Sequence, residues 1–308
     1  MVQNLYSSKS HGNRDRSTDP DDIFKRGSTT YYYSTKLFPK NIRKEVTKLY
    51  NFVRITDNYV DSVPQDVKGF LKFKQEYYSV LSGKKSNNVI ITNFVELSKQ
   101  KQFKLEWVDA FLYSMEMDTK KSTYKDLEEL ETYLYGSAEV IGLMMNKVMG
   151  ISPKANESAR YLGKAMQFIN FIRDIDEDLD LQRTYFPTSD LESVGLKKLT
   201  RGEARRKPTE FISFVRSQIH LYFMWQKRAE LGFVFLPKNM RIAVKTASDM
   251  YLWTAQEIYK NPFIVYDAKI KPVWTKVLLN GLKNALKIYS PFKLNGIVKK
   301  VPVKAPSL

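Results

Sequence analysis

The stretch Tyr161–Pro187, which reads YLGKAMQFINFIRDIDEDLDLQRTYFP, decides the fold of this chain. An α-helix turns by about 100° per residue, so side chains at i, i+3, i+7 and i+11 fall within a sector roughly 80° wide. In this stretch these positions hold two amides and two carboxylates, Gln167, Asn170, Asp174 and Asp178. The other side of the predicted helix is apolar. A polar stripe with an apolar back predicts a polar site inside a bundle of helices.

A second stretch, residues 39–64, repeats this arrangement. Pro39 suits the first turn of a helix, apolar residues recur at helical spacing as far as Val60, and Pro64 ends the segment. Beside the apolar stripe, a sector roughly 60° wide holds Tyr50, Arg54, Asp57 and Asp61. The sequence therefore predicts two helices that each present Asp-x-x-x-Asp, one turn apart, next to an arginine.

Two such acid pairs are what a magnesium-bound diphosphate requires. Carboxylate oxygens are ligands for hard cations such as Mg²⁺ or Mn²⁺, and these cations bridge to phosphate oxygens. Arg54 and Arg173 would add charge-assisted hydrogen bonds to the same oxygens. A single pair is more often a solvated acidic face, but two pairs with matching polar neighbours favour a shared site. Asp176 and Asp180 lie about 180° from the polar stripe, so the pattern predicts that they face solvent.

The composition narrows the possible chemistry. The chain has 308 residues, of which 43% are hydrophobic, enough for a large core. It has no Cys, which excludes disulfides, a thiolate nucleophile and cysteine-held zinc or iron–sulfur sites. With only two His, a histidine-rich metal site or a catalytic triad is not expected, so a metal would be held by oxygen.

The chain is strongly basic, with a formal net charge of +17. Such an excess suits a nucleic acid, an anionic membrane surface or a polyanionic small substrate, and it suits equally a lysine-rich solvated surface. The basic clusters are not interleaved with aromatic residues and no nucleic-acid-binding motif occurs, so we expect no nucleic-acid partner. Because no GxGxxG motif occurs, we expect no nicotinamide cofactor.

The hydrophobic pattern predicts helices throughout, at about 66–117 (two or three), 124–149, 211–235, 240–259 and 272–288. Ala138 and Gly142, one turn apart, would let a neighbouring helix or an apolar ligand come close. Tyr251 falls on an inward face, where it would line a pocket or pack in the core. Strand-like alternation and internal repeats are absent, so we predict an all-α, single-domain bundle.

We expect a catalytic domain at 23–290 between a flexible polar tail at 1–22 and a basic tail at 291–308. No apolar stretch is long enough to span a bilayer, and the first residues lack the apolar core of a signal peptide. The expected location is the cytoplasm. The basic charge would also allow peripheral contact with a membrane surface. The sequence leaves the oligomeric state open.

Six motifs follow one another along the chain: STTYYYSTKLFPKNIR, LYNFVRITDNYVD, MEMD, YLYGSAEVIG, LGKAMQFINFIRDIDED and QRTYFP. Together they resemble the squalene/phytoene synthase family of head-to-head prenyl transferases. The resemblance covers Ser28 to about Leu282, and the segment Tyr251–Trp274 is more similar to the phytoene synthase branch. Three positions depart from the family's usual pattern: Asn58 replaces a second acid, Glu139 replaces a glycine, and Gln182 precedes Arg183 in place of glycine.

The resemblance implies an isoprenoid-synthase fold, with the two aspartate motifs facing each other across the mouth of an apolar pocket. It implies that Mg²⁺ is bound by Asp57, Asp61, Asn170, Asp174 and Asp178. It also implies contacts with the diphosphates or the prenyl chains for Ser28, Thr30, Tyr31, Tyr50, Arg54, Tyr133, Gln167, Arg173, Arg183, Tyr185 and Tyr251.

The implied reaction joins two geranylgeranyl diphosphates head to head into phytoene through a cyclopropylcarbinyl diphosphate. The alternative is a C30 product, squalene or dehydrosqualene, from farnesyl diphosphate, because pocket depth selects the chain length and is not visible in the sequence. Two hypotheses of other classes are a non-catalytic relative that acts as a scaffold and a basic helical binding protein. Loss of the aspartate motifs would mark the scaffold, and both motifs are present.

Overall fold

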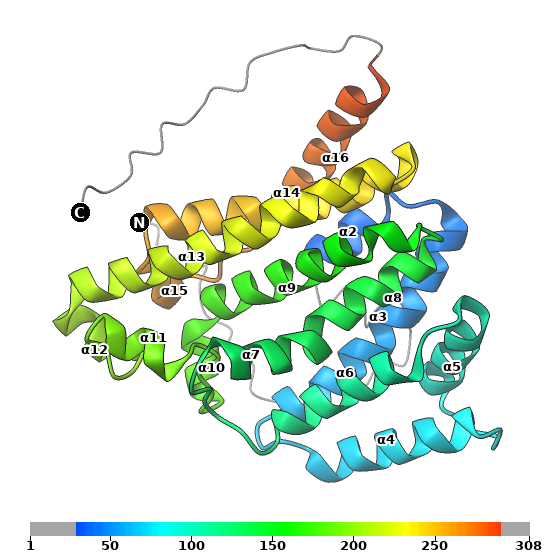
Figure 1. Cartoon of the computed structure of the whole chain (residues 1–308), viewed down its shortest axis with the longest axis horizontal. Coiled ribbons are helices and arrows are strands. Elements are labelled where there is room, and N and C mark those ends of the chain that lie inside the picture. The colour runs from blue at the N-terminus through cyan, green and yellow to red at the C-terminus, as the bar shows by residue number, and fades with distance from the viewer. Residues whose placement is uncertain (1–28, 291–308) are drawn as a thin grey trace, which may run out of the picture.

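The structure, a computed structural model, describes residues 29–290, and its helices lie side by side in one body (Figure 1). No β-strand occurs in this range; the chain makes only an isolated parallel bridge between Tyr124 and Pro187. The all-α prediction is confirmed. The α-helices are α2 (Thr29–Thr35), α3 (Lys40–Asp61), α4 (Val67–Leu81), α5 (Val89–Lys101), α6 (Leu105–Met117), α7 (Leu127–Leu134), α8 (Val140–Val148), α9 (Asn156–Arg173), α10 (Ile175–Asp180), α11 (Thr188–Ser193), α12 (Arg201–Arg206), α13 (Pro208–Glu230), α14 (Lys238–Lys260), α15 (Ile264–Asp267) and α16 (Trp274–Tyr289).

Three shorter helical turns connect some of these elements. The π-helical turn η1 (Tyr135–Glu139) joins α7 to α8, and the 3₁₀ turns η2 (Pro153–Ala155) and η3 (Leu231–Phe235) precede α9 and follow α13. The predicted segments 124–149 and 211–235 are therefore each interrupted. The expected tails, 1–22 and 291–308, lie outside the described residues, so the domain boundaries stay predictions.

Helix α3 forms as its sequence predicts. Pro39 stands at the N-cap with φ of −52°, which prepares the chain for the first turn. The helix ends at Asp61, where Ser62 turns to an extended conformation. Its apolar stripe packs into a core cluster with α5, α6 and α8, and this fixes which side of α3 carries the acids.

The polar stripe of Tyr161–Pro187 lies on two helices, and the prediction of one continuous helix was wrong. Helix α9 ends at Arg173, Asp174 has non-helical angles of φ −100° and ψ 18°, and α10 begins at Ile175. The Arg173 guanidinium donates to the carboxylate of its own neighbour, Asp174, with Nε 2.8 Å from Oδ1. Adjacent side chains diverge in a regular helix, so this contact goes together with the break.

Helix α9 runs through the middle of the bundle and packs against α13, α8, α14 and η1 (Figure 1). Its approach to α8 and to η1 depends on two glycines. A Cβ atom at Gly142 would lie 2.1 Å from the carbonyl oxygen of Ala159, and one at Gly163 would lie 2.3 Å from that of Ala138. Only glycine permits this spacing. The close helix expected at Ala138 and Gly142 is therefore α9.

Candidate active site

One deep cavity of about 660 Å³ opens between α2, α3, η1, α8, α9, α10 and α14. Along α3 its lining changes from Val46 and Leu49 to Asp57 and Asp61, and along α9 it changes from Leu162 and Met166 to Asn170 and Arg173. The two helices thus contribute apolar side chains from their N-terminal parts and polar ones from their C-terminal ends. A volume of this size is typical of a small-molecule site.

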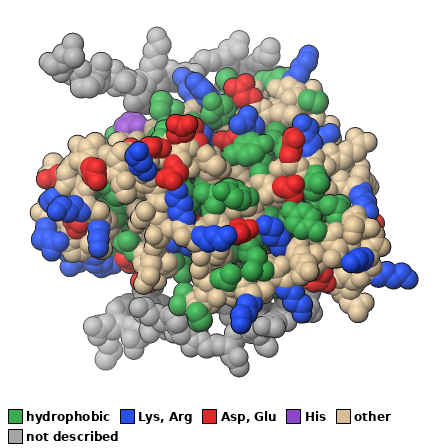
Figure 2. All heavy atoms as spheres, turned by 60° about the horizontal axis from the view of Figure 1, so that its bottom comes forward, with side chains coloured by type: hydrophobic (Ala, Val, Ile, Leu, Met, Phe, Trp, Pro, Cys, Tyr) green, Lys and Arg blue, Asp and Glu red, His purple; other side chains and the backbone are tan. Residues whose placement is uncertain are grey.

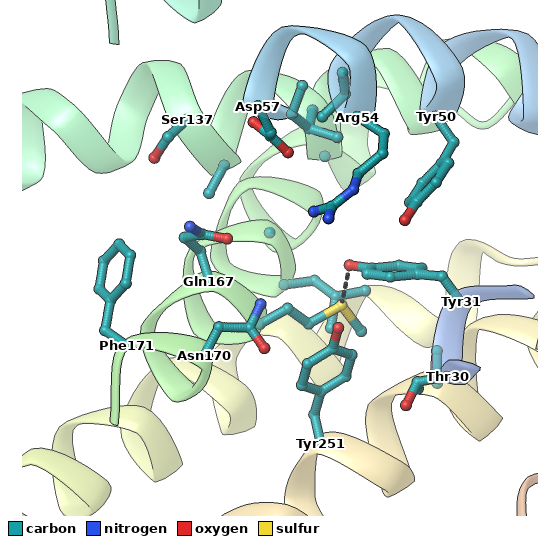
Figure 3. A pocket seen from close by; sticks show the side chains of 18 of the residues that line it. Thr30, Tyr31, Tyr50, Arg54, Asp57, Ser137, Gln167, Asn170, Phe171 and Tyr251 are labelled. Atoms are coloured by element: carbon teal, nitrogen blue, oxygen red, sulfur yellow. Dashed lines mark hydrogen bonds between the residues drawn. The ribbon is translucent and has the colours of Figure 1, made fainter. Parts of the chain in front are cut away.

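Nearly all the residues that the sequence analysis assigns to the site line this cavity. Figure 3 shows how Tyr31 from α2, Arg54 from α3, Gln167 from α9 and Tyr251 from α14 converge on it. The predicted residues in the lining are Thr30, Tyr31, Tyr50, Arg54, Asp57, Asp61, Tyr133, Gln167, Asn170, Arg173, Asp174, Asp178, Tyr185 and Tyr251. Ser28 lies outside the described residues.

Burial and crowding of negative charge make the acids at the polar end hard to ionise. Burial, together with the charge of Asp61, raises the pKa of Asp57 to about 7 despite the opposing charge of Arg54. Burial and the charges of Asp174 and Asp61 raise the pKa of Asp178 well above its usual range. This end of the cavity is therefore suited to receive positive charge.

Asp174 already has cationic neighbours. Burial would raise its pKa, but the hydrogen bond and charge of Arg173, together with the charge of Lys269, outweigh burial and hold the pKa below its usual range. The Lys269 ammonium lies 3.5 Å from Asp174 and also pairs with Glu177. Of the pair Asp174 and Asp178, Asp174 is thus the ionised member.

Arg183, for which the resemblance implies contact with a diphosphate, does not line the cavity. It is 4% exposed and lies behind α3, where its Nη1 donates to Asp61 at 2.9 Å. It also donates to the carbonyl of Val60 and, at 3.2 Å, to that of Asp118. A guanidinium with this many fixed partners holds Asp61 in place and is not free to follow a substrate.

Asp118, which ends the MEMD motif, anchors the wall of the site. Its carboxylate accepts hydrogen bonds from Tyr133 at 2.7 Å and Tyr185 at 3.0 Å. Burial raises its pKa to about 6, although Arg183 and the two hydroxyls favour the charged form. These bonds join the end of α6 to α7 and to the loop before α11. Tyr133 and Tyr185 therefore contribute their rings to the cavity while their hydroxyls are engaged.

The donors at the polar end fit a hard cation in type. Carboxylate and amide oxygens are the ligands that Mg²⁺ prefers, and the buried Oδ1 of Asn170 has no hydrogen-bond partner among the described residues. The C-terminal ends of α3 and α9 add partial negative charge. Between residues 29 and 290, however, no three acidic, His or Cys side chains are gathered closely enough to hold a metal by themselves. A cation would need additional oxygen ligands from a substrate.

The structure adds site residues that the sequence analysis missed. Lys269 and Lys271, from the loop between α15 and α16, line the cavity. Burial and the charges of Lys269 and Arg173 lower the pKa of Lys271 to about 8. The signal in the sequence was the alternating pair in AKIKP, but loops carry no periodicity from which to place it.

The prediction that both Asp176 and Asp180 face away from the site holds only for Asp176. Asp176 is absent from the cavity lining, and its carboxylate lies 3.9 Å from the Arg201 guanidinium. Asp180 is exposed but belongs to the lining at the mouth. The break at Asp174 removes the regular rotation on which that prediction depended.

Comparison with known proteins places these features in a family. The model of the squalene/phytoene synthase family matches residues 24–277. Phytoene synthase 3 of Zea mays is 26% identical over 268 residues, which make up 84% of this chain and 62% of the maize protein. The 15-cis-phytoene synthase of Pantoea ananas is 26% identical over 239 residues, 73% of this chain and 76% of that protein.

Solved structures have the same fold. A dehydrosqualene synthase in complex with a ligand superposes with a TM-score of 0.77 at 19% identity, covering 86% of this chain and 93% of that one. A squalene synthase from Alicyclobacillus acidocaldarius gives a TM-score of 0.68 at 19% identity, covering 79% of this chain and 94% of that one. At this level of identity the likeness shows the isoprenoid-synthase helical fold alone.

Proposed function

The chain belongs to the squalene/phytoene synthase family, and on that premise we propose that it joins two geranylgeranyl diphosphates head to head into phytoene and releases diphosphate. The observation that carries the proposal is the cavity, with an acid-lined end and an apolar remainder that suits prenyl chains. The relatives named phytoene synthases support the C20 substrate over farnesyl diphosphate.

The first step breaks the C1–O bond of one substrate, and the leaving group is a diphosphate. Arg54 is suited to receive it, because its guanidinium points into the cavity and makes no hydrogen bond or ion pair with another described residue (Figure 3). Arg173, Lys269 and Lys271 add positive charge at the same end. Bound Mg²⁺ would supply further positive charge next to the leaving group. The ligands for it would be phosphate oxygens and the side chains of Asp57, Asp61, Asn170, Asp174 and Asp178.

The allylic cation is attacked by the C2–C3 double bond of the second substrate, and loss of a proton gives a cyclopropylcarbinyl diphosphate. This intermediate loses its own diphosphate, rearranges and releases a proton to form the hydrocarbon. The cavity must surround both cations without trapping them. The rings of Tyr31, Tyr251 and Phe171 present aromatic faces.

The tyrosine hydroxyls around the cavity are held in their neutral, less nucleophilic form. Burial raises the pKa values of Tyr31, Tyr133, Tyr185 and Tyr251, so their hydroxyls stay neutral. The apolar lining from Leu49 and Met166 also keeps water from the cation.

The test is incubation of the purified protein with Mg²⁺ and either geranylgeranyl or farnesyl diphosphate, with products identified by mass spectrometry. We expect phytoene from the C20 substrate. A C30 hydrocarbon formed in preference would overturn the proposed chain length and leave the reaction class standing. Absence of diphosphate release from both substrates would overturn the enzyme proposal.

A further inference from the structure

Helix α16 carries an exposed apolar stripe. Leu279, Leu282, Leu286 and Tyr289 are 68%, 59%, 65% and 56% exposed. At about 100° per residue they fall within a sector roughly 80° wide. Figure 1 shows α16 projecting at the upper right of the bundle, on the opposite side from α4. Contiguous exposed apolar side chains of this kind mark an interaction surface.

The stripe cannot turn inward, because the opposite side of α16 is fixed. Asn284 is buried, and its Nδ2 donates to Asp249 on α14 at 2.9 Å. Gly281 packs so closely on the turn after α2 that a Cβ atom there would lie 2.7 Å from Cδ1 of Leu37. Rotation of the helix would break the hydrogen bond of Asn284. It would also bring a larger side chain into the narrow space that Gly281 occupies. The exposure of the leucines is therefore set by the packing.

Lysines follow one edge of the stripe. Lys276, Lys283 and Lys287 lie next to it on the helix. The Lys276 ammonium lies over the Trp253 ring of α14, 3.7 Å from its centroid, whereas Lys283 and Lys287 are exposed. Lys276 and Lys283 also flank an open hollow between α14 and α16 that Leu279 and Met250 line. An apolar stripe with lysines along its edge is typical of helices that lie in the surface of a membrane.

The charge of this region is of one sign. After Asp267 every charged side chain of the sequence is a lysine. By contrast, basic and acidic side chains are interspersed on the face drawn in Figure 2. Each lysine close to an anionic bilayer adds attraction, and a protein partner would need a matching acidic surface around an apolar groove. Lipid supplies both the apolar layer and the negative charge.

We propose that α16 is an in-plane docking helix for an anionic lipid bilayer, with the stripe Leu279–Leu282–Leu286–Tyr289 in the apolar layer and the exposed Lys283 and Lys287 at the headgroups. None of the helices in the described part of the chain is long and apolar enough to cross a membrane, so the contact is at the surface. The docking is independent of the chemistry proposed above. One further point rests on that chemistry: α16 packs on α2 and α14, which line the cavity, so a hydrocarbon product would form one helix layer from the lipid.

The experiment measures binding of the full chain, without substrate, to vesicles of phosphatidylglycerol and phosphatidylcholine and to vesicles of phosphatidylcholine alone. The double variant Leu282→Gln/Leu286→Gln removes part of the stripe, and Lys283→Gln/Lys287→Gln removes charge. The matched control is Leu71→Gln/Leu105→Gln, because these leucines are 49% and 50% exposed on α4 and α6. Circular dichroism and thermal unfolding check that each variant folds.

We expect binding to the anionic vesicles that weakens with added salt. The affinity of the leucine variant for these vesicles should fall by roughly tenfold or more. The affinity of the lysine variant should fall by roughly fivefold for each charge removed. The control should bind like the parent. Trp274, which begins α16 and is 52% exposed, should shift its fluorescence to shorter wavelength on binding, and Trp274→Phe should remove that shift.

Three results would overturn the proposal. The parent could fail to bind anionic vesicles. The α16 variants could bind as well as the parent, which would assign binding to another basic segment. Sedimentation could show a dimer that the leucine variant dissociates, which would assign the stripe to a second copy of the chain. None of these results changes the outcome of the substrate assay.

Discussion

At the residue scale, Asp174 and Asp176 are two positions apart and have different surroundings. Asp174 lines the cavity beside Arg173 and Lys269, whereas Asp176 lies away from it near Arg201. Asp178 lines the cavity with Asp174. Of these three neighbouring acids, two therefore face the cavity and one does not. Asp176 can thus serve as a matched control for substitutions of Asp174 and Asp178.

We expect Asp174→Ala and Asp178→Ala each to lower the rate of diphosphate release by roughly 100-fold or more, because each removes a group that acts on developing charge. Asp176→Ala should keep the parent's rate within about twofold, as expected for an exposed ion pair with Arg201. Single-turnover release of diphosphate measures all three. Loss of activity in Asp176→Ala with retention in Asp178→Ala would reverse the assignment.

Arg183 acts through Asp61, and its loss should be visible in stability. Arg183→Met would leave the buried partners Val60, Asp118 and Tyr185 without their donor, so the free energy of unfolding should fall by about 3 kcal/mol. Urea denaturation measures it. Arg201→Met is the control. Arg201 is partly exposed and its guanidinium lies 3.4 Å from the carboxylate of Asp267. Its replacement should lower the free energy of unfolding by less than about 1 kcal/mol. Equal effects of both substitutions would contradict the positioning role.

At the element scale, the close approach of α9 to η1 depends on Gly163. Gly163→Ala would push a methyl group against the Ala138 carbonyl, which we expect to cost about 1–3 kcal/mol of unfolding free energy. Gly202→Ala, on α12, meets nothing within 4 Å and should be neutral or stabilising by about 0.4–1 kcal/mol. Thermal or urea unfolding distinguishes them. A stabilised Gly163→Ala protein would show that the helices can separate freely.

Element positions were largely predictable, and element ends less so. The apolar periodicity of α3 and α14 places these helices to within a few residues, because burial against neighbours requires that periodicity. The break between α9 and α10 was not predictable from periodicity. It accompanies a contact between adjacent side chains, Arg173 and Asp174, that a regular helix would not make.

At the scale of the whole molecule, the acid-lined end of the cavity makes stability depend on pH and on cations. The folded state holds a proton on Asp57 with a pKa of about 7, above the ordinary value of about 3.9 that applies to the unfolded chain. The stabilisation from this group is therefore fully present below pH of about 4 and is lost as pH rises towards 7. Asp57→Asn removes this dependence without removing the side chain's volume.

We expect the melting temperature of the Asp57→Asn protein in EDTA to exceed that of the parent at pH 8, and the difference to shrink or reverse at pH 4.5. Mg²⁺ with inorganic diphosphate should raise the melting temperature of the parent at pH 8 and have less effect on the variant, because bound cations relieve the repulsion among the acids. Differential scanning fluorimetry measures both. A pH-independent difference between the two proteins would contradict this origin of the instability.

The sequence by itself determined the helical class, the two helix faces that carry Asp57, Asp61, Gln167 and Asn170, and the family. These features follow from local periodicity and short motifs, because a helix that buries one side must repeat its apolar residues at helical spacing. Only the tertiary structure decided that Arg183 holds Asp61 from behind, that Lys269 and Lys271 enter the cavity, and that the leucines of α16 stay outside. Those outcomes depend on how distant elements and aperiodic loops pack together, and no local pattern records that packing.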